Sequence, residues 1–347
     1  MKTKILAASI LGVYFMFLQP VQGQKFDNAL SYMNYMSDQY RKVMEDMWDY
    51  TSAAAHGKSA RKVENRRKDL LNTIAKVQGT IAKMPDFQGD KALRDTAVSY
   101  LTLSYNVLNY DYAKIVDMEA IAEESYDQME AYINTQEAAN QKLDQSGQRM
   151  EAEQISFAQK HDIKIAENKD RLSNKLEKAN KVYNYYNRIY LIFFKSYKQD
   201  FFLSEAIQKH DINAIEQNRG SLLKFATEGT KKLDSIKGFG ADNSLKISLK
   251  QVLDFYRMEA STKIPVITNF YLKKETYEKT KTELDAKMEM ARTKQDIAQY
   301  NKALADYTKA TGDYNRINTE LTQKHNMLME SWDKTVQSFI DRQVPKK

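Results

Sequence analysis

The feature that most constrains the fold of this chain is its shortage of residues that interrupt helices. Only four prolines and eleven glycines occur among 347 residues, whereas the turns of a β-protein are rich in both. The long stretches between them are rich in Ala, Lys, Glu, Gln, Leu and Met, which favour helices by intrinsic propensity. The sequence therefore predicts an all-α fold.

An internal repeat divides the chain, because a shift of 152 residues brings similar residues into register. The motif Glu-x-x-Arg-x-x-Leu-Leu begins at Glu64 and again at Glu216, and the motif Phe-x-x-Asp-x-x-Leu begins at Phe87 and again at Phe239. Amphipathic helices gain stability by burying their apolar stripes together. We therefore predict two tandem related antiparallel bundles of four to five long helices each.

The spacing of apolar residues predicts the individual helices. In the first copy, intervals of three, four and seven residues indicate helices over about 27–55, 59–83 and 90–112, and a further helix from about 115 onwards. We expect the chain to be organised as a signal peptide, a first helical repeat and a second helical repeat, over residues 1–23, 24–171 and 172–347.

Several single residues are expected to mark the helix ends. Asp90 and Asp242 are the expected N-caps of the third helix in each copy, and Pro265 is expected in the first turn of a later helix. Gly147 and Gly312 are expected to turn or kink the chain. The clear loops before the third helix of each copy argue against the alternative fold, one continuous coiled-coil rod.

The N-terminus has the pattern of a secretory signal peptide. Residues 1–4 carry two lysines, residues 5–18 are an apolar run, and Pro20 precedes compact residues that end at Gly23. The apolar run is shorter than the roughly 20 residues that a membrane anchor needs. We predict cleavage after Gly23, export to the periplasm, the cell surface or the medium, and no transmembrane segment in the mature chain. Because the chain has no cysteine, it is neither disulfide-bonded nor a lipoprotein.

The charges of the chain are unevenly distributed. The formal net charge is +7, which is modest for this length, but residues 58–76 are mainly basic and residues 111–153 are mainly acidic. Neighbouring helices of opposite sign pack favourably, so this pattern predicts internal charge complementarity. Together with export, it argues against nucleic acid as a partner.

The sequence offers no familiar catalytic or metal-binding motif. The chain has four histidines, and three of them (His161, His210 and His325) lie in Gln-Lys-His, whereas His56 does not. Metal ligands on one helix need a spacing of three or four residues, and neither His-x-x-x-His nor Glu-x-x-His occurs. Gly-x-Ser-x-Gly and a glycine-rich phosphate loop are also missing. We predict no catalytic residues, no cofactor, no metal and no enzymatic activity.

The most distinctive residues are the tyrosines, of which there are 22. They are densest in the stretch that contains Tyr183, Tyr185, Tyr186 and Tyr190. A tyrosine offers a flat face with a polar tip, which suits the binding of sugars, peptides or proteins. These four residues are therefore a possible binding surface. The alternative interpretation is a wide core between helices, with hydroxyl groups that reach its edge.

With its leader, its cysteine-free mature part and its helices rich in Tyr and Asn, the whole chain resembles a family of exported bacterial surface proteins. That family was first described in spirochaetes and is frequent in Bacteroidetes, and residues 182–194 are the stretch most similar to it. The resemblance implies a surface or periplasmic location, and it implies no known activity and no functional residues.

The sequence favours an exported cell-envelope or surface protein with a binding or structural role, whose partner is an envelope protein or a glycan. Two alternatives remain. A membrane-active helical toxin would need a hidden apolar hairpin of about two membrane-spanning lengths. A binder of metal or of a small ligand would use the interior of a bundle.

Overall fold

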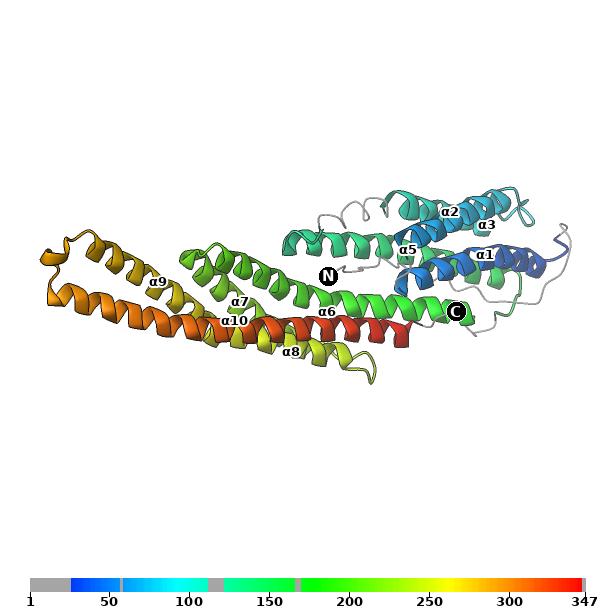
Figure 1. The fold of residues 1–347 in the computed structure, drawn as a ribbon. Coiled ribbons are helices and arrows are strands. Elements are labelled where there is room, and N and C mark those ends of the chain that lie inside the picture. The colour runs from blue at the N-terminus through cyan, green and yellow to red at the C-terminus, as the bar shows by residue number, and fades with distance from the viewer. Residues whose placement is uncertain (1–25, 57–58, 112–121, 166–169, 345–347) are drawn as a thin grey trace. The chain divides into compact units, whose positions relative to one another are not determined.

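The computed structural model describes residues 26–56, 59–111, 122–165 and 170–344, which are almost entirely helical (Figure 1). The α-helices are α1 (Ala29–Ala55), α2 (Ala60–Ala82), α3 (Ala92–Asn106), α5 (Tyr126–Lys160), α6 (Arg171–Gln208), α7 (Ile212–Ser235), α8 (Ser244–Met258), α9 (Ile264–Asp285) and α10 (Lys294–Gln343). Short helices of other types are η1 (Val107–Asp111), η2 (Glu259–Lys263) and η3 (Glu289–Ala291). The predicted all-α fold is confirmed. The predicted signal peptide, residues 1–23, lies outside the described residues.

The contacts within the chain divide it into two compact units. Unit 1 comprises Met1–Asn187 together with Gln337–Lys347, and unit 2 comprises Arg188–Val336. Both divisions fall inside a helix, one in α6 and one in α10. The expected division between residues 171 and 172 instead coincides with the start of α6. That the two units arose by duplication of one segment stays a prediction.

Equivalent local structures nevertheless occur in the two units at the shift of 152 residues. Phe87 forms an isolated antiparallel bridge with Asp90, and Phe239 forms one with Asp242. Each aspartate side chain also accepts a hydrogen bond of 2.9 Å from the backbone N–H two residues later. The prediction that these aspartates are the N-caps was wrong by one residue, because the N-caps are Lys91 and Asn243. The aspartates stabilise the start of α3 and of α8 from one residue before the cap.

A π-helical turn follows α3 at η1 and follows α8 at η2. Such a turn takes backbone groups out of the regular hydrogen-bond ladder of the α-helix. In each unit an arginine from a neighbouring helix bonds a backbone carbonyl of the turn. Arg67 Nη1 of α2 donates to Leu108 O at 2.9 Å, and Arg219 Nη1 of α7 donates to Ala260 O at 3.3 Å. The same guanidinium groups also pair with the glutamate three residues earlier. The Glu-x-x-Arg motif of the repeat thus holds the π-helical turn.

The predictions for glycine and proline had mixed outcomes. Gly147 and Gly312 lie inside the uninterrupted helices α5 and α10, so the expectation that they turn the chain was wrong. Pro265 lies in the first turn of α9, as predicted. In α7, a Cβ at Gly229 would meet Ile192 Cγ2 at 3.1 Å, whereas a Cβ at Gly220 would meet nothing within 4 Å. Gly229 therefore permits close packing of α7 against α6, and Gly220 does not serve packing.

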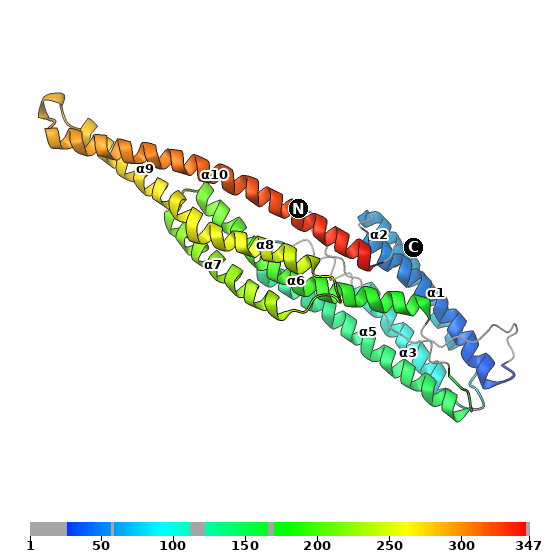
Figure 2. The ribbon, with the colours of Figure 1, turned by 90° about the horizontal axis from the view of Figure 1, so that it is seen from below.

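Aromatic residues join α9 and α10 into a hairpin within unit 2, which extends past the ends of α7 and α8 (Figure 2). Phe270 and Tyr277 of α9 lie seven residues apart, as do Tyr300, Tyr307 and Tyr314 of α10. Phe270 stacks on Tyr314 with ring centroids 4.4 Å apart, and Tyr277 stacks on Tyr307 at 5.1 Å. Residues seven apart share one face of a helix, so this ladder holds the hairpin together. Among the described helices, none has the length and apolar character needed to cross a membrane.

Candidate functional site

The four tyrosines singled out from the sequence do not form an open surface. Tyr183, Tyr185, Tyr186 and Tyr190 keep at most 9% of their accessible surface. The Tyr185 ring lies 5.7 Å from that of Phe339, and burial raises the pKa of Tyr183. The predicted binding surface is therefore buried, and this burial favours the alternative interpretation, a core between helices.

The four histidines lie in different surroundings. In unit 1, His56 Nδ1 lies 2.7 Å from Asp341 Oδ1, and the ring of His161 packs 4.4 Å from that of Phe157. In unit 2, the ring of His210 lies 4.9 Å from that of Tyr271. In the described parts of the chain, no group of three or more histidine, aspartate and glutamate side chains is arranged so that it could hold a metal ion.

The remaining histidine belongs to a buried acidic cluster in unit 2, which consists of Asp200, Glu259 and His325. Asp200 comes from α6, Glu259 opens the π-helical turn η2, and His325 comes from α10. Asp200 Oδ2 lies 3.1 Å from His325 Nε2, and both carboxyl residues keep no more than 7% of their accessible surface. Glu259 Oε2 is enclosed without a hydrogen-bond partner among the described residues, as is the hydroxyl group of Tyr256.

The surroundings of the cluster change its proton affinities. Burial, repulsion from the charge of Asp200 and hydrogen bonding with Asp200 raise the pKa of Glu259 to about 9. Hydrogen bonding with Asp200 raises the pKa of His325, against the opposing effect of burial. Two carboxyl groups this close in a protein interior cannot both ionise cheaply, so one retains its proton. At neutral pH Glu259 therefore keeps its proton.

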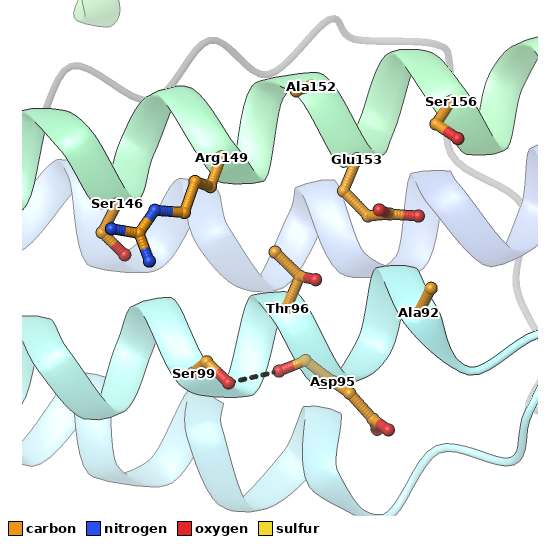
Figure 3. A pocket seen from close by; sticks show the side chains of 9 residues that line it. All are labelled: Ala92, Asp95, Thr96, Ser99, Ser146, Arg149, Ala152, Glu153 and Ser156. Carbon is orange, nitrogen blue, oxygen red and sulfur yellow. Dashed lines mark hydrogen bonds between the residues drawn. The ribbon is translucent and has the colours of Figure 1, made fainter.

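A polar groove between α3 and α5 of unit 1 is the second candidate site (Figure 3). Its volume is about 750 Å³, which falls within the range of small-molecule sites. Helix α3 lines it with Ala92, Asp95, Thr96 and Ser99, and helix α5 lines it with Ser146, Arg149, Ala152, Glu153 and Ser156. Six of these nine side chains are those of alanine, serine or threonine, which are too short to fill the space between the two helices. The groove exists because the facing positions are small.

The charged residues of the groove differ in how far they are compensated. Asp95 Oδ1 forms an ion pair of 2.8 Å with Arg94 Nη2, and Arg94 lies outside the groove. Arg149 forms neither a hydrogen bond nor an ion pair with another described residue. Glu153 also lacks both, and its Oε1 is enclosed. The groove thus offers one uncompensated positive group and one uncompensated negative group.

No protein-family model, no curated protein and no solved structure matches this chain. The resemblance to exported bacterial surface proteins therefore stays a prediction, and the candidate sites are interpreted from their own geometry.

Sequence reasoning missed both the acidic cluster and the groove. For the cluster, the repeat itself holds a signal: the shift of 152 places Glu259 on Val107 and Asp200 on Trp48. Where one of two residues in register at this shift is apolar and the other is a carboxyl residue, the carboxyl group is a candidate for a buried polar site. For the groove there is no comparable signal, because small residues on α3 and α5 mark a groove only once the two helices are known to face each other.

Proposed function

We propose that the mature chain is a ligand-binding protein of the bacterial cell envelope, and that the groove between α3 and α5 is its binding site. The observation that supports this most is Arg149, whose guanidinium group has no partner among the described residues and lines a groove of ligand size. Arginine is well suited to bind carboxylate or phosphate groups through paired hydrogen bonds. An uncompensated arginine inside a groove is a ready position for such a group.

The groove suits binding better than catalysis. Nucleophilic catalysis needs a serine within hydrogen-bond reach of a general base, and the described lining includes no histidine. The Ser99 hydroxyl donates to the backbone carbonyl of Asp95 at 2.8 Å in its own helix (Figure 3). A hydroxyl engaged in this way is not activated for attack, so we propose a binding role without enzymatic activity.

Filling the groove tests this function. In Ser146→Phe, an aromatic ring occupies the space, and in the control Gln145→Phe the same ring is added at an exposed neighbour outside the lining. We expect small peptides, sugars or organic acids that raise the melting temperature of the parent chain to lose that effect in Ser146→Phe and to keep it in Gln145→Phe. If no compound shifts the parent, or if both variants respond alike, the groove is not the binding site.

A second candidate function is docking to another protein through the tip of the α9–α10 hairpin. Met288 and Met290 are 80% and 100% exposed there, the highest values among the large apolar side chains of the described chain. The loop that presents them is well braced, because Lys287 pairs with Asp296 at 2.7 Å and Asp296 accepts the Thr293 N–H at 2.9 Å. A braced loop with exposed methionines fits an apolar pocket on a partner.

The carboxylate between the two methionines favours a protein over a membrane. Glu289 forms no ion pair with another described residue, and inserting it into lipid would be costly. We expect Met288→Ser with Met290→Ser to abolish capture of an envelope protein by the mature chain, while Ser146→Phe leaves that capture intact. The opposite pattern would assign the interaction to the groove.

Export by the leader is a separate part of the proposal. Its support is the sequence pattern at residues 1–23. In a bacterium that expresses the full chain, we expect the mass of the product to correspond to a chain that begins at Gln24 and to be found outside the cytoplasm. A full-length product in the cytosolic fraction would contradict export and leave the binding groove to be explained in another compartment.

A further inference from the structure

We infer that the ligand of the α3–α5 groove is a short peptide with a free amino end and a free carboxyl end. This inference rests on the proposed function, because it names the ligand class of the same site. It follows from four properties of the lining residues: the signs of their charges, the spacing of those charges, the hydroxyl groups of the lining and the types of side chain that the lining lacks.

The two uncompensated charges lie toward opposite ends of the groove. Figure 3 shows the Arg149 side chain directed along α5 toward Ser146, and the Glu153 side chain directed the other way, toward Ser156. The enclosed Oε1 of Glu153 has no donor among the described residues, and an ionised carboxylate in that state is costly. A ligand with a positive group near Glu153 and a negative group near Arg149 would offset both charges.

The spacing of the charges sets the length of the ligand. Arg149 and Glu153 are four residues apart on one helix, which is about 6 Å along its axis, and their side chains diverge from there. One extended residue spans about 3.5 Å, so the two ends of a dipeptide or tripeptide lie about 7–10 Å apart. A single α-amino acid, whose charges are separated by less than one residue, is too short to reach both groups.

Hydroxyl groups line the groove on both helices. Thr96 and Ser99 lie on α3, and Ser146 and Ser156 lie on α5 beyond the two charged residues. A hydroxyl can both donate and accept a hydrogen bond, and the backbone of a peptide presents N–H donors and C=O acceptors in alternation. The lining therefore offers polar partners to the backbone of a bound peptide as well as charged partners to its ends.

The lining also argues against the other polar ligands. The described lining residues include no aromatic side chain, whereas sugar sites commonly use the faces of tyrosine or tryptophan rings. A simple anion would satisfy Arg149 and leave Glu153 without a partner. A peptide with both charged ends offers a partner to both residues.

Calorimetric titration of the full mature chain with trialanine tests the inference. We expect binding with a dissociation constant in the millimolar range or tighter, because the groove is open to solvent and a ligand of this size makes few contacts. Acetylation of the amino end removes the charge that faces Glu153, and amidation of the carboxyl end removes the charge that faces Arg149. We expect each modified peptide to bind at least tenfold more weakly than trialanine.

Variants of the protein give the complementary test. We expect Arg149→Gln to weaken trialanine tenfold or more and to make no further difference to the amidated peptide, and Glu153→Gln to do the same for the acetylated peptide. The controls Lys142→Gln and Glu151→Gln remove the same charges from α5 outside the lining and should leave binding within twofold.

The outcomes separate this inference from the function on which it rests. If maltotriose binds in the groove and trialanine does not, the binding function stands and the peptide assignment is overturned. If trialanine, maltotriose and a citrate probe all fail to bind, or bind equally well to Ser146→Phe, the proposed function falls as well.

Discussion

The two π-helical turns have the same backbone geometry and different interiors. In unit 1, the first residue of η1 is Val107, with 2% of its surface exposed; in unit 2, the first residue of η2 is Glu259, with 7% exposed. The residue in register with Asp200 is Trp48, also buried. An apolar pair thus occupies the positions in unit 1 at which unit 2 has two carboxyl groups.

The comparison teaches that the backbone of the turn does not depend on what is buried beside it. Both turns are held by the arginine that bonds a backbone carbonyl, Arg67 or Arg219. The acidic cluster is therefore an addition to a scaffold that is complete without it. Such an addition lowers stability, because apolar residues in place of a buried ionic group are often neutral or stabilising.

The α3–α5 groove is a feature of unit 1, whereas the acidic cluster is a feature of unit 2. In register with Asp95 and Ser99 of unit 1, helix α8 of unit 2 carries Ile247, which is 60% exposed, and Gln251. The groove of unit 1 therefore depends on the side chains of α3 and α5 in this unit and not on an arrangement of helices that both units have. Each unit has its own chemistry on a similar framework.

The largest effect is expected when the acidic residue is moved to the other unit. Val107→Glu would bury a carboxyl group in unit 1 among apolar residues and without the aspartate that accompanies Glu259. We expect a loss of about 3–5 kcal/mol in the free energy of unfolding at pH 7. Urea unfolding followed by the fluorescence of Trp48, in a chain with Trp332→Phe, measures it.

The control for this prediction is Val107→Leu, which keeps the site apolar and should cost less than about 1.5 kcal/mol. A loss from Val107→Glu no larger than that of the control would mean that unit 1 accommodates a carboxyl group as readily as unit 2 does.

The next largest effect is expected from removing the arginines that hold the turns. Arg67→Met and Arg219→Met each leave a backbone carbonyl without its donor, which costs about 1–3 kcal/mol. We expect the larger loss for Arg67, because its bond is shorter, 2.9 Å against 3.3 Å. Trp48 reports the unfolding of unit 1 and Trp332 that of unit 2, each in a single-tryptophan chain.

Arginines that form only surface ion pairs serve as matched controls. Arg66→Met in unit 1 breaks ion pairs of 3.7 Å and 3.6 Å with Asp49 and Asp69, and Arg257→Met in unit 2 breaks one of 3.4 Å. Both arginine side chains are solvent-exposed, so each change should cost less than about 1 kcal/mol. Equal losses from Arg66 and Arg67 would show that the carbonyl bond contributes nothing to the turn.

The smallest effect is expected at the two glycines of α7. Gly220→Ala should stabilise the chain by about 0.5–1 kcal/mol, because alanine has the higher helix propensity and nothing lies within 4 Å of the new methyl group. Gly229→Ala should lose this gain, since its methyl group meets Ile192 at 3.1 Å. Thermal unfolding of the two variants, which differ only in packing, compares them directly.

Much of this fold can be predicted from the sequence, and the reason lies in local interactions. The observed bounds of α1 and α2 lie within two residues of the predicted helices, because apolar spacing and capping are properties of neighbouring residues. The paired turns at Asp90 and Asp242 were predicted for the same reason. By contrast, Gly147 did not end a helix, because packing of α5 outweighs the modest propensity cost of one glycine.

The sites depend on how helices face one another, which one sequence does not contain. For Tyr183 and its neighbours the sequence left both a binding surface and a core between helices open, because whether an aromatic side chain is covered depends on the helix that packs against it. Asp200, Glu259 and His325 lie on separate elements and come together only in the folded bundle. The same holds for the facing small residues of the groove.

The central claim is that Glu259 keeps its proton in the folded interior of unit 2. The pH dependence of unfolding tests this claim most directly. The pKa of Glu259 is raised to about 9 in the folded chain from 4.5, so between these values the folded chain binds one more proton and rising pH favours the unfolded chain. The raised pKa of His325 acts in the same direction, since its stabilising charge is lost as the pH rises.

The measurement is urea unfolding at pH 5 and at pH 8, followed by Trp332 in a Trp48→Phe chain, with and without Glu259→Val. The parent is predicted to lose about 4 kcal/mol between the two pH values. Glu259→Val is predicted to lose much less and to exceed the parent by about 1–4 kcal/mol at pH 8. A parent whose stability is constant or rises from pH 5 to pH 8, or a variant that is less stable than the parent at pH 8, would contradict a protonated Glu259 in the folded protein.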